Sequence, residues 1–345
     1  MAPEVEFAAM RRALDLALTA DAPLGPNPRV GCVLLDPAGE IVGTGFHRGA
    51  GTAHAEVVAL EAAGSAAKGA TAVITLEPCS HIGRTGPCTQ ALIDAGVSRV
   101  VFGQTDDSPL GSGGGDALRA VGVEVEGGLL ADEAAAVNPA WSLAVRNRRP
   151  FVTWKFAATL DGRSAAADGS SQWITSLAAR QDVHRLRAAC DAVVVGTGTV
   201  LADDPWLTVR DSAGVPLAEQ PLRVVVGRRQ LPVGSRVLDD TAETLLLRTR
   251  EPSEVMCALF ARDRLRVWLE GGPRLAGAFL RAGLVDEVVA YVAPVLLGAG
   301  RHALDDAGIS TISDAIRLGH VDFGRVGPDL RIIAHTRPRA PQQEG

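Results

Sequence analysis

Apolar residues recur at two different spacings along this chain of 345 residues, and each spacing predicts one type of element. Between residues 4 and 20 they recur every three or four positions, which is typical of a helix with one buried face. The β-branched runs RVGCVLLD (29–36) and EIVGTGFH (40–47) flank Pro37-Ala38-Gly39, which predicts a β-hairpin. Strands that alternate with helices indicate an α/β layered fold. Further strands are expected over 71–77 and 97–103, and helices from residue 54 and over 87–95.

The pattern begins again after RNRRP (146–150), a charged stretch that ends in proline and is typical of a linker. FVTWKFAATLDG then begins a new strand. A chain of this length commonly divides into two domains, and we expect them over 1–146 and 150–337, followed by a disordered polar tail over 338–345. In the second domain we expect helices around 176–189 and 273–282, and strands over 191–196, 222–227, 243–248, 265–270 and 285–292.

Composition changes this picture by excluding several classes of protein. Apolar residues make up 47% and charged residues 21%, as in soluble globular proteins. We expect neither a membrane helix nor an export signal, because the chain has no apolar run of the required length or kind. Five cysteines fit a reducing cytoplasm better than a disulfide framework. The net charge of −6 argues against nucleic acid as a partner, but allows a small phosphorylated ligand held by a few arginines.

Candidate chemistry comes first from TAHAEVVAL (52–60), which places His54 and Glu56 two positions apart at a predicted helix start. Downstream, TLEPCSHIGRTGPC (75–88) supplies Cys79 and Cys88, each directly after a proline. One imidazole and two thiolates suit a catalytic zinc, which keeps its fourth position for water. His-x-Glu followed by Pro-Cys and a second Cys is the pattern of the zinc deaminases. Here eight residues separate the cysteines instead of two.

Each part of this pattern also has an ordinary structural explanation. A lone His-x-Glu pair is usually solvated, and a lone cysteine usually packs as a small core residue, as we expect for Cys32. The order of the three parts favours the metal site. His81 is an alternative ligand, but its polar loop favours contact with a substrate.

The chemistry of such a site is hydrolytic deamination. Zinc lowers the pKa of a bound water, so that hydroxide forms near neutral pH. The hydroxide attacks an amidine-like ring carbon that carries an exocyclic amine, and Glu56 transfers the protons. The products are a ring carbonyl and ammonia.

Separate motifs in a shared order make nearly the whole sequence resemble the RibD family of bifunctional riboflavin-biosynthesis proteins, in which a pyrimidine deaminase is fused to a reductase. The residues that carry the resemblance are PNPRVGCV (26–33), HAE (54–56), TLEPCSHIGRTGPC (75–88), LDGR (160–163), SQWIT (171–175), LADDPWLTVR (201–210) and EGGPRLAGAFL (270–280).

The resemblance implies a cytidine-deaminase-like zinc domain followed by a dihydrofolate-reductase-like α/β domain. The first would deaminate 2,5-diamino-6-ribosylamino-4(3H)-pyrimidinone 5′-phosphate, and the second would use NADPH to reduce the ribosyl chain to ribityl. It implies that Glu56 is catalytic and that zinc is bound by His54, Cys79 and Cys88. The substrate residues that it implies are Asn27, His47, His81 and Arg84.

For the second domain, the choice of NADPH over NADH rests on the resemblance alone. VGTGTVLADD (195–204) and LEGGPRLAGAF (269–279) each read as strand, glycine turn and helix, and offer either a phosphate site or only a turn. The cofactor residues that the resemblance implies are Ala157, Trp173, Thr199, Asp203, Gly272, Pro273, Arg274, Leu275, Ala276, Gly277 and Ala278. The substrate residues that it implies are Ser171, Arg187, Leu207, Arg210 and Glu270.

Three of these side chains can also be judged by their chemistry. The guanidinium groups of Arg187 and Arg210 would suit a phosphate clamp, although surface arginines are an equal reading without the resemblance. Trp173 stands in a polar stretch, which favours stacking on a cofactor over core packing. Lys155 is a further polar group that we expect near the reacting sugar.

The chain departs from the family pattern at two places. The family usually has Asp-Pro-Asn-Pro before a glycine-rich loop, whereas this chain has DDSPLGSGGG (106–115), and Gly86 stands where proline is common. We expect both changes to loosen the loop that closes the deaminase pocket.

Two other functions remain open from the sequence. One is a deaminase of another base or nucleoside with an inactive or repurposed reductase-like domain. The other is a binding protein in which zinc only stabilises the fold, although such a site has no use for an uncoordinated Glu56. We expect a homo-oligomer in the cytoplasm that binds a phosphorylated pyrimidine and neither nucleic acid nor membrane.

Overall fold

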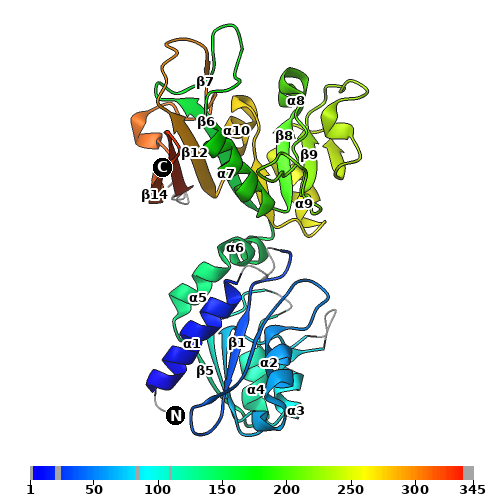
Figure 1. Cartoon of the computed structure of the whole chain (residues 1–345), viewed down its shortest axis with the longest axis vertical. Coiled ribbons are helices and arrows are strands. Elements are labelled where there is room, and N and C mark those ends of the chain that lie inside the picture. The colour runs from blue at the N-terminus through cyan, green and yellow to red at the C-terminus, as the bar shows by residue number, and fades with distance from the viewer. Residues whose placement is uncertain (1–2, 20–24, 82–85, 109–110, 337–345) are drawn as a thin grey trace, which may run out of the picture. The chain divides into compact units, whose positions relative to one another are not determined.

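The computed structural model describes residues 3–19, 25–81, 86–108 and 111–336. The chain divides into two compact units, Met1–Arg148 and Arg149–Gly345 (Figure 1). No helix in these described ranges is both long enough and apolar enough to cross a membrane. The expected tail over 338–345 lies outside the described residues.

The first unit is built on one five-stranded sheet with the order β2-β1-β3-β4-β5. The predicted hairpin is confirmed, because β1 pairs with β2 in antiparallel register, with Gly31 opposite Phe46. β1 is also antiparallel to β3, whereas β3, β4 and β5 are parallel. The strands are β1 (Gly31–Leu35), β2 (Ile41–Phe46), β3 (Thr71–Leu76), β4 (Arg99–Gln104) and β5 (Glu124–Gly127).

Helices cover both faces of this sheet, because successive side chains of a strand point to opposite faces. In β1, Cys32 and Leu34 pack with α2, α3 and α4, and Val33 and Leu35 pack with α1 and α5. Cys32 is therefore a core residue, as its apolar strand predicts. The helices are α1 (Pro3–Ala17), α2 (Ala55–Ala63), α3 (Cys88–Asp94), α4 (Gly114–Ala120), α5 (Ala131–Val137) and α6 (Pro139–Asn147).

Two glycines of β2 allow α2 to lie directly against the sheet. A Cβ atom on Gly45 would lie 2.3 Å from the carbonyl oxygen of Ala55, and one on Gly43 would lie 2.3 Å from that of Ala59. Any other residue at either position would push α2 away from β2. Since α2 begins directly after His54, these glycines help to place that side chain.

The second unit is built on an eight-stranded sheet with the order β10-β9-β8-β11-β6-β12-β15-β14. The first six strands in this order are parallel, and β15 and β14 are antiparallel additions at one edge. A small two-stranded sheet joins β7 (Arg163–Ala165) to β13 (Arg301–His302). The main strands are β6 (Phe151–Thr159), β8 (Ala192–Gly196), β9 (Leu222–Val226), β10 (Thr244–Leu247), β11 (Arg266–Leu269), β12 (Glu287–Ala293), β14 (Leu318–Val326) and β15 (Asp329–Thr336).

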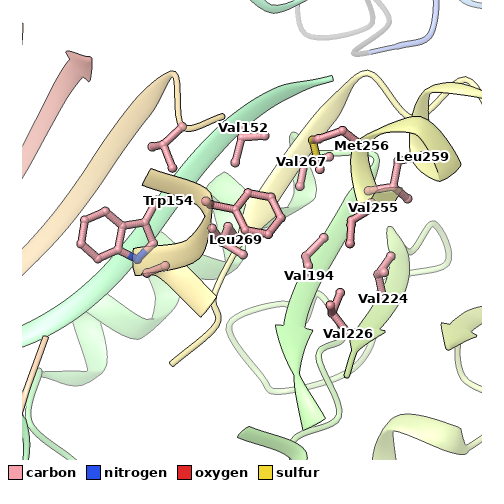
Figure 2. Packing of buried hydrophobic residues seen from close by; sticks show 14 of the residues in the cluster. Val152, Trp154, Val194, Val224, Val226, Val255, Met256, Leu259, Val267 and Leu269 are labelled. Atoms are coloured by element: carbon pink, nitrogen blue, oxygen red, sulfur yellow. The ribbon is translucent and has the colours of Figure 1, made fainter. Parts of the chain in front are cut away.

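Alternate side chains of these strands pack into two separate hydrophobic cores, one on each face of the sheet. Val194 and Val224 pack with α9 (Pro252–Phe260) and α10 (Pro273–Arg281), in the core shown in Figure 2. Val193 and Val195 pack on the opposite face with α7 (Leu177–Ala188) and α8 (Thr197–Asp203). Because the six strands are parallel, their carboxyl ends all lie at one edge of the sheet, where the turns into α8 and α10 are found.

Candidate metal centre and reductase site

Three elements of the first unit bring His54, Cys79 and Cys88 together. His54 is the N-cap residue of α2, Cys79 follows β3, and Cys88 is the first residue of α3. His54 Nδ1 lies 3.0 Å from Cys88 Sγ and 3.7 Å from Cys79 Sγ. The three ligand atoms all lie within 4.8 Å of one another, which is the spacing that a shared metal ion requires. One nitrogen and two sulfurs form a donor set that suits zinc.

The surroundings shift the pKa values of the two thiols in opposite directions. Hydrogen bonds from Cys88 and His54 lower the pKa of Cys79 to about 4, and its Sγ also accepts from the backbone N–H of Cys88 at 3.4 Å. The pKa of Cys88 is raised by its interaction with Cys79 and by burial. A bound metal ion would deprotonate both, because a coordinating thiol loses its proton.

Glu56 lies beside this triad without belonging to it. It occupies the first turn of α2 with only 3% of its surface exposed, and its carboxyl group interacts with the Cys88 thiol. Burial raises its pKa, because the charged form is poorly solvated there. A buried carboxyl group with a raised pKa is suited to accepting a proton and returning it.

Asn27 and His47 lie next to the triad. The His47 ring lies edge-on to the His54 ring, with their centroids 5.2 Å apart. His47 Nδ1 lies 3.1 Å from the carbonyl oxygen of Ala53, and Asn27 Nδ2 lies 2.9 Å from His47 Nε2. Since the carbonyl oxygen requires a proton on Nδ1, Nε2 accepts from Asn27 and His47 is neutral. Burial accordingly lowers the pKa of His47.

His81 and Arg84 are predicted on the loop between the two cysteines. His81 is half-buried, and its Nδ1 has no hydrogen-bond partner among the residues that the structure describes. Its ring is not part of the ligand cluster found among the described residues, so the alternative ligand role gains no support. Arg84 lies outside the described residues.

The segment DDSPLGSGGG (106–115), which departs from the family pattern, is held by hydrogen bonds on both sides of residues 109 and 110. These two residues lie outside the described ranges. Asp106 accepts from the N–H of Ser108 at 2.8 Å, and Ser108 Oγ accepts from the N–H of Gly111 at 2.9 Å. The buried carboxylate of Glu77 accepts from the N–H groups of Asp106 and Gly115. These bonds oppose the loosening expected from the sequence. Sequence reasoning missed Glu77, although it stands directly before Pro78-Cys79.

In the second unit, Glu270 forms the centre of the candidate site. It follows β11, the strand between β8 and β6, and its carboxylate accepts three hydrogen bonds from Arg187, the shortest 2.6 Å long. The Trp268 Nε1–H also donates to Glu270. Burial alone would raise the pKa of Glu270. The positive charges of Arg187 and Lys155 lower it by more than burial raises it, so that the pKa is about 2.

The expected phosphate clamp of Arg187 and Arg210 requires correction. Arg187 is a buried residue of α7, only 9% exposed, and it also donates to the carbonyl oxygen of Thr208 at 2.8 Å. Its guanidinium is therefore committed to Glu270 and to the backbone. Arg210 is more accessible and stacks on Trp206, with 4.4 Å from its Cζ to the ring centroid. Of the two, Arg210 is the one placed to meet a phosphate.

Lys155 lies close to this ion pair from the neighbouring strand β6. Burial lowers its pKa, whereas the Glu270 carboxylate raises it and the Arg187 guanidinium lowers it. Leu207 is buried, with a left-handed φ of 57°, and Ala157 is half-buried on β6.

The two glycine turns lie side by side at the carboxyl edge of the sheet. A Cβ atom on Gly272, the N-cap of α10, would lie 3.8 Å from Thr199 Oγ1 of α8. The first N–H groups of a helix lack partners within the helix and can receive an anionic group. Asp203 is exposed at the end of α8, and half-buried or exposed positions also include Pro273, Arg274, Leu275 and Ala278.

Two of the expected cofactor residues offer no surface. Ala276 is fully buried in the core, and a Cβ atom on Gly277 would lie 2.3 Å from the carbonyl oxygen of Asp306. Both residues lie on the buried side of α10, where they pack against neighbouring parts of the chain. Trp173 is 68% exposed and stacks against Arg180 at 4.3 Å, so it is not a core residue. Ser171 is half-buried nearby in the chain.

Replacing a sulfur ligand should abolish tight metal binding. We expect Cys88→Ser to lower zinc affinity by at least about tenfold, because a serine hydroxyl is a far poorer zinc ligand than a thiolate. Zinc content after dialysis against a competing chelator measures this. Cys257→Ser is the matched control, since Cys257 is an exposed thiol of α9 in the other unit and should leave zinc unchanged. Equal zinc in both variants would contradict the site.

The Glu270 carboxylate should make stability depend on acid. Its pKa falls from 4.5 to about 2 on folding, so its contribution is present above pH 4.5 and is lost as pH falls toward 2. The shift corresponds to about 3 kcal/mol. Urea unfolding, followed by circular dichroism between pH 5 and about pH 2.5, should show this loss in the wild type and not in Glu270→Gln. Glu219→Gln, at an exposed position, should follow the wild type.

Each of the two units matches the profile of a known protein family. A family profile described as the RibD C-terminal domain matches residues 150–332. A second profile, the cytidine and deoxycytidylate deaminase zinc-binding region, matches residues 3–104.

Relatives match over almost the whole chain. The RibD protein of Mycobacterium tuberculosis is 52% identical, covering 95% of this chain and 97% of the relative. That of Escherichia coli is 43% identical, covering 93% and 96%. The structure of Acinetobacter baumannii RibD aligns with a TM-score of 0.88 at 37% identity, over 97% of this chain and 99% of that one.

The name of a further solved structure states both a deaminase and a reductase activity. The Thermotoga maritima diaminohydroxyphosphoribosylaminopyrimidine deaminase/5-amino-6-(5-phosphoribosylamino)uracil reductase aligns with a TM-score of 0.83 at 31% identity, covering 97% of this chain and 99% of that one. The expected deaminase-like and reductase folds are thus confirmed. This chain belongs to the RibD family of riboflavin-biosynthesis enzymes, which join a zinc-binding deaminase domain to a reductase domain.

Proposed function

We propose that this chain deaminates 2,5-diamino-6-ribosylamino-4(3H)-pyrimidinone 5′-phosphate and then reduces its ribosyl group to give 5-amino-6-ribitylamino-uracil 5′-phosphate. Residues 1–146 would form the deaminase domain and residues 150–337 the NADPH-dependent reductase domain. The name of the Thermotoga maritima relative supports this substrate pair. The division of the chain between Arg148 and Arg149 supports the assignment of one reaction to each unit.

The single observation that carries the deaminase proposal is the position of Glu56. This carboxyl group is buried beside the three zinc ligands His54, Cys79 and Cys88 and yet lies outside the ligand set. A structural zinc site has no use for such a group, because it is closed by four protein ligands. A buried, uncoordinated carboxyl group is what proton transfer at a zinc-bound water requires.

The residues of this chain would then share the reaction as follows. Zinc, when bound, supplies a water whose pKa is low enough for hydroxide to form near neutral pH. Glu56 would take the first proton of that water and deliver it to the ring nitrogen. It would then take the second proton from the new hydroxyl group on the ring carbon and give it to the departing amine, so that ammonia leaves as the carbonyl forms. Its raised pKa favours both directions of transfer. Asn27, His47 and His81 would surround the pyrimidine, and Arg84 remains a substrate residue on sequence grounds only.

In the reductase unit, the ring-opened ribosylamine would be reduced as an imine: its C1′ would take a hydride from NADPH, and its nitrogen would take a proton. Glu270 and Arg187 form a rigid buried pair at the carboxyl edge of the sheet, and Lys155 adds a polar group near the sugar. The accessible guanidinium of Arg210 would bind the substrate phosphate. Ser171 and Leu207 complete the proposed substrate residues. The proposed NADPH contacts are Ala157, Trp173, Thr199, Asp203, Gly272, Pro273, Arg274, Leu275 and Ala278.

We further propose that the enzyme works in the cytoplasm as a homo-oligomer. Five free thiols suit a reducing compartment. The edge strand β14 and its neighbour β15 expose the apolar side chains of Leu318, Val321, Phe323 and Leu330, and an apolar sheet edge is commonly covered by another chain. We expect analytical ultracentrifugation to give a mass of at least two chains, whereas a monomer at micromolar concentration would contradict this.

Mass spectrometry of the products tests the two reactions separately. With the diaminopyrimidinone phosphate alone, the substrate should gain about one mass unit as an amino group is replaced by oxygen, and ammonia should be released; NADPH should then add about two units more. Glu56→Gln should retain zinc and lose ammonia release by at least about a hundredfold, because a carboxamide cannot accept the water proton.

Each failure in this experiment has its own meaning. An active Glu56→Gln variant would refute the role of Glu56. Deamination of a different base in place of this substrate would favour the alternative of a deaminase with a repurposed reductase unit. Deamination without NADPH oxidation would remove the reductase half of the proposal alone.

A further inference from the structure

A side chain outside the proposed catalytic groups holds the loop that carries Asn27. Asn138 lies at the junction of α5 and α6 and is only 6% exposed. Its Oδ1 accepts from the backbone N–H of Arg29 at 2.8 Å, and its Nδ2 donates to the carbonyl oxygen of Arg29 at 2.7 Å. A single carboxamide thus bonds both the backbone N–H and the backbone C=O of Arg29, which lies 109 positions away in the chain.

The held segment leads directly to the deaminase site. The carbonyl oxygen of Val30, next to Arg29, accepts from the backbone N–H of His47 at 3.0 Å. Asn27, two residues before Arg29, donates to the Nε2 atom of the same histidine. The His47 ring in turn packs edge-on against His54. A continuous series of contacts therefore connects Asn138 to the metal ligand His54, through the segment that contains Arg29 and then through His47.

The direction of these hydrogen bonds fixes which atom of Asn27 remains available. His47 Nδ1 donates to Ala53, so the amide nitrogen of Asn27 must be the donor to Nε2. The carboxamide oxygen of Asn27 is then left with no partner in the described part of the chain. The side chain of Asn27 is half-buried and contacts His47, the neighbour of His54, so its oxygen can accept a hydrogen bond from an N–H or amino group of a pyrimidine bound there.

We propose that Asn138 is a positioning residue of the deaminase: by holding the Arg29 peptide, it keeps the Asn27 oxygen directed at the pyrimidine substrate. This inference rests on the proposed deaminase function. The Asn138 carboxamide provides both the acceptor and the donor that bind the Arg29 backbone. Loss of the side chain would remove both part-buried hydrogen bonds to the Arg29 backbone, and the loop would no longer be held at this point.

The test compares Asn138→Ala with Ser142→Ala in the full-length zinc enzyme. Ser142 lies on the same helix α6, and its Oγ accepts from Gln104 Nε2 at 2.7 Å, so Ser142→Ala also removes a hydrogen bond of α6 without touching the Arg29 loop. We expect Asn138→Ala to raise the KM for the diaminopyrimidinone phosphate about tenfold, with kcat within about twofold of wild type. Zinc content should be unchanged in both variants, and Ser142→Ala should keep the wild-type KM.

Several outcomes would overturn the inference. They are an unchanged KM in Asn138→Ala, an equal rise in KM in Ser142→Ala, or a fall in kcat accompanied by loss of zinc. If Asn138→Ala does not fold, Asn138→Asp replaces it, since a carboxylate still accepts from the Arg29 N–H but no longer donates to the carbonyl oxygen. A KM above wild type then supports the inference, and a wild-type KM overturns it. A wild-type enzyme that releases no ammonia would instead refute the proposed function itself.

Discussion

The deaminase unit depends on the contact between α2 and β2, where two glycines replace side chains that the fold has no room for. A Cβ atom at either Gly43 or Gly45 would lie 2.3 Å from a carbonyl oxygen of α2, far inside van der Waals contact. This contact sets the distance of α2 from the sheet, and with it the place of His54 and Glu56 at the start of the helix. Cys79 is placed by the end of the central strand β3, and Cys88 by the start of α3. Three ligands that are distant in sequence therefore share one small volume because three elements are packed against one sheet.

The reductase unit depends on a different kind of constraint, which is a buried ion pair. Glu270 and Arg187 are both almost fully buried, and each is further satisfied by a second group, Trp268 for the carboxylate and Thr208 for the guanidinium. A buried charge that loses its partner is strongly destabilising, so the pair fixes α7 against the carboxyl end of β11. The glycine turns before α8 and α10 lie at this same edge of the sheet, because parallel strands all end there. The site is thus an outcome of strand direction as much as of any single residue.

Several features of the structure could not be predicted from the sequence, for physical reasons. The hairpin β14–β15 was not predicted, because most of β14 is exposed on both faces and lacks the alternation of a half-buried strand. Arg187 reads as a possible surface residue because sequence does not show that Glu270, 83 positions later, faces it. Ala276 and Gly277 lie within a glycine-rich motif, and only the packing of α10 shows that they point inward. Glu77 and Asn138 act through backbone groups, and backbone partners leave no residue-specific trace in a sequence.

The sequence by itself determined the α/β class, the hairpin of the first unit, the six parallel strands of the second unit and the chemistry of the zinc ligand set, because spacing and residue type carry that information locally. Imidazole, thiolate and carboxylate groups have fixed donor properties wherever they stand. Only the tertiary structure decided that the three ligand atoms lie within 4.8 Å of one another while Glu56 stays outside the set. It also decided which arginine is accessible and which loop Asn138 holds. Distances between residues far apart in the chain come from packing against a common sheet, and a sequence without its fold does not contain them.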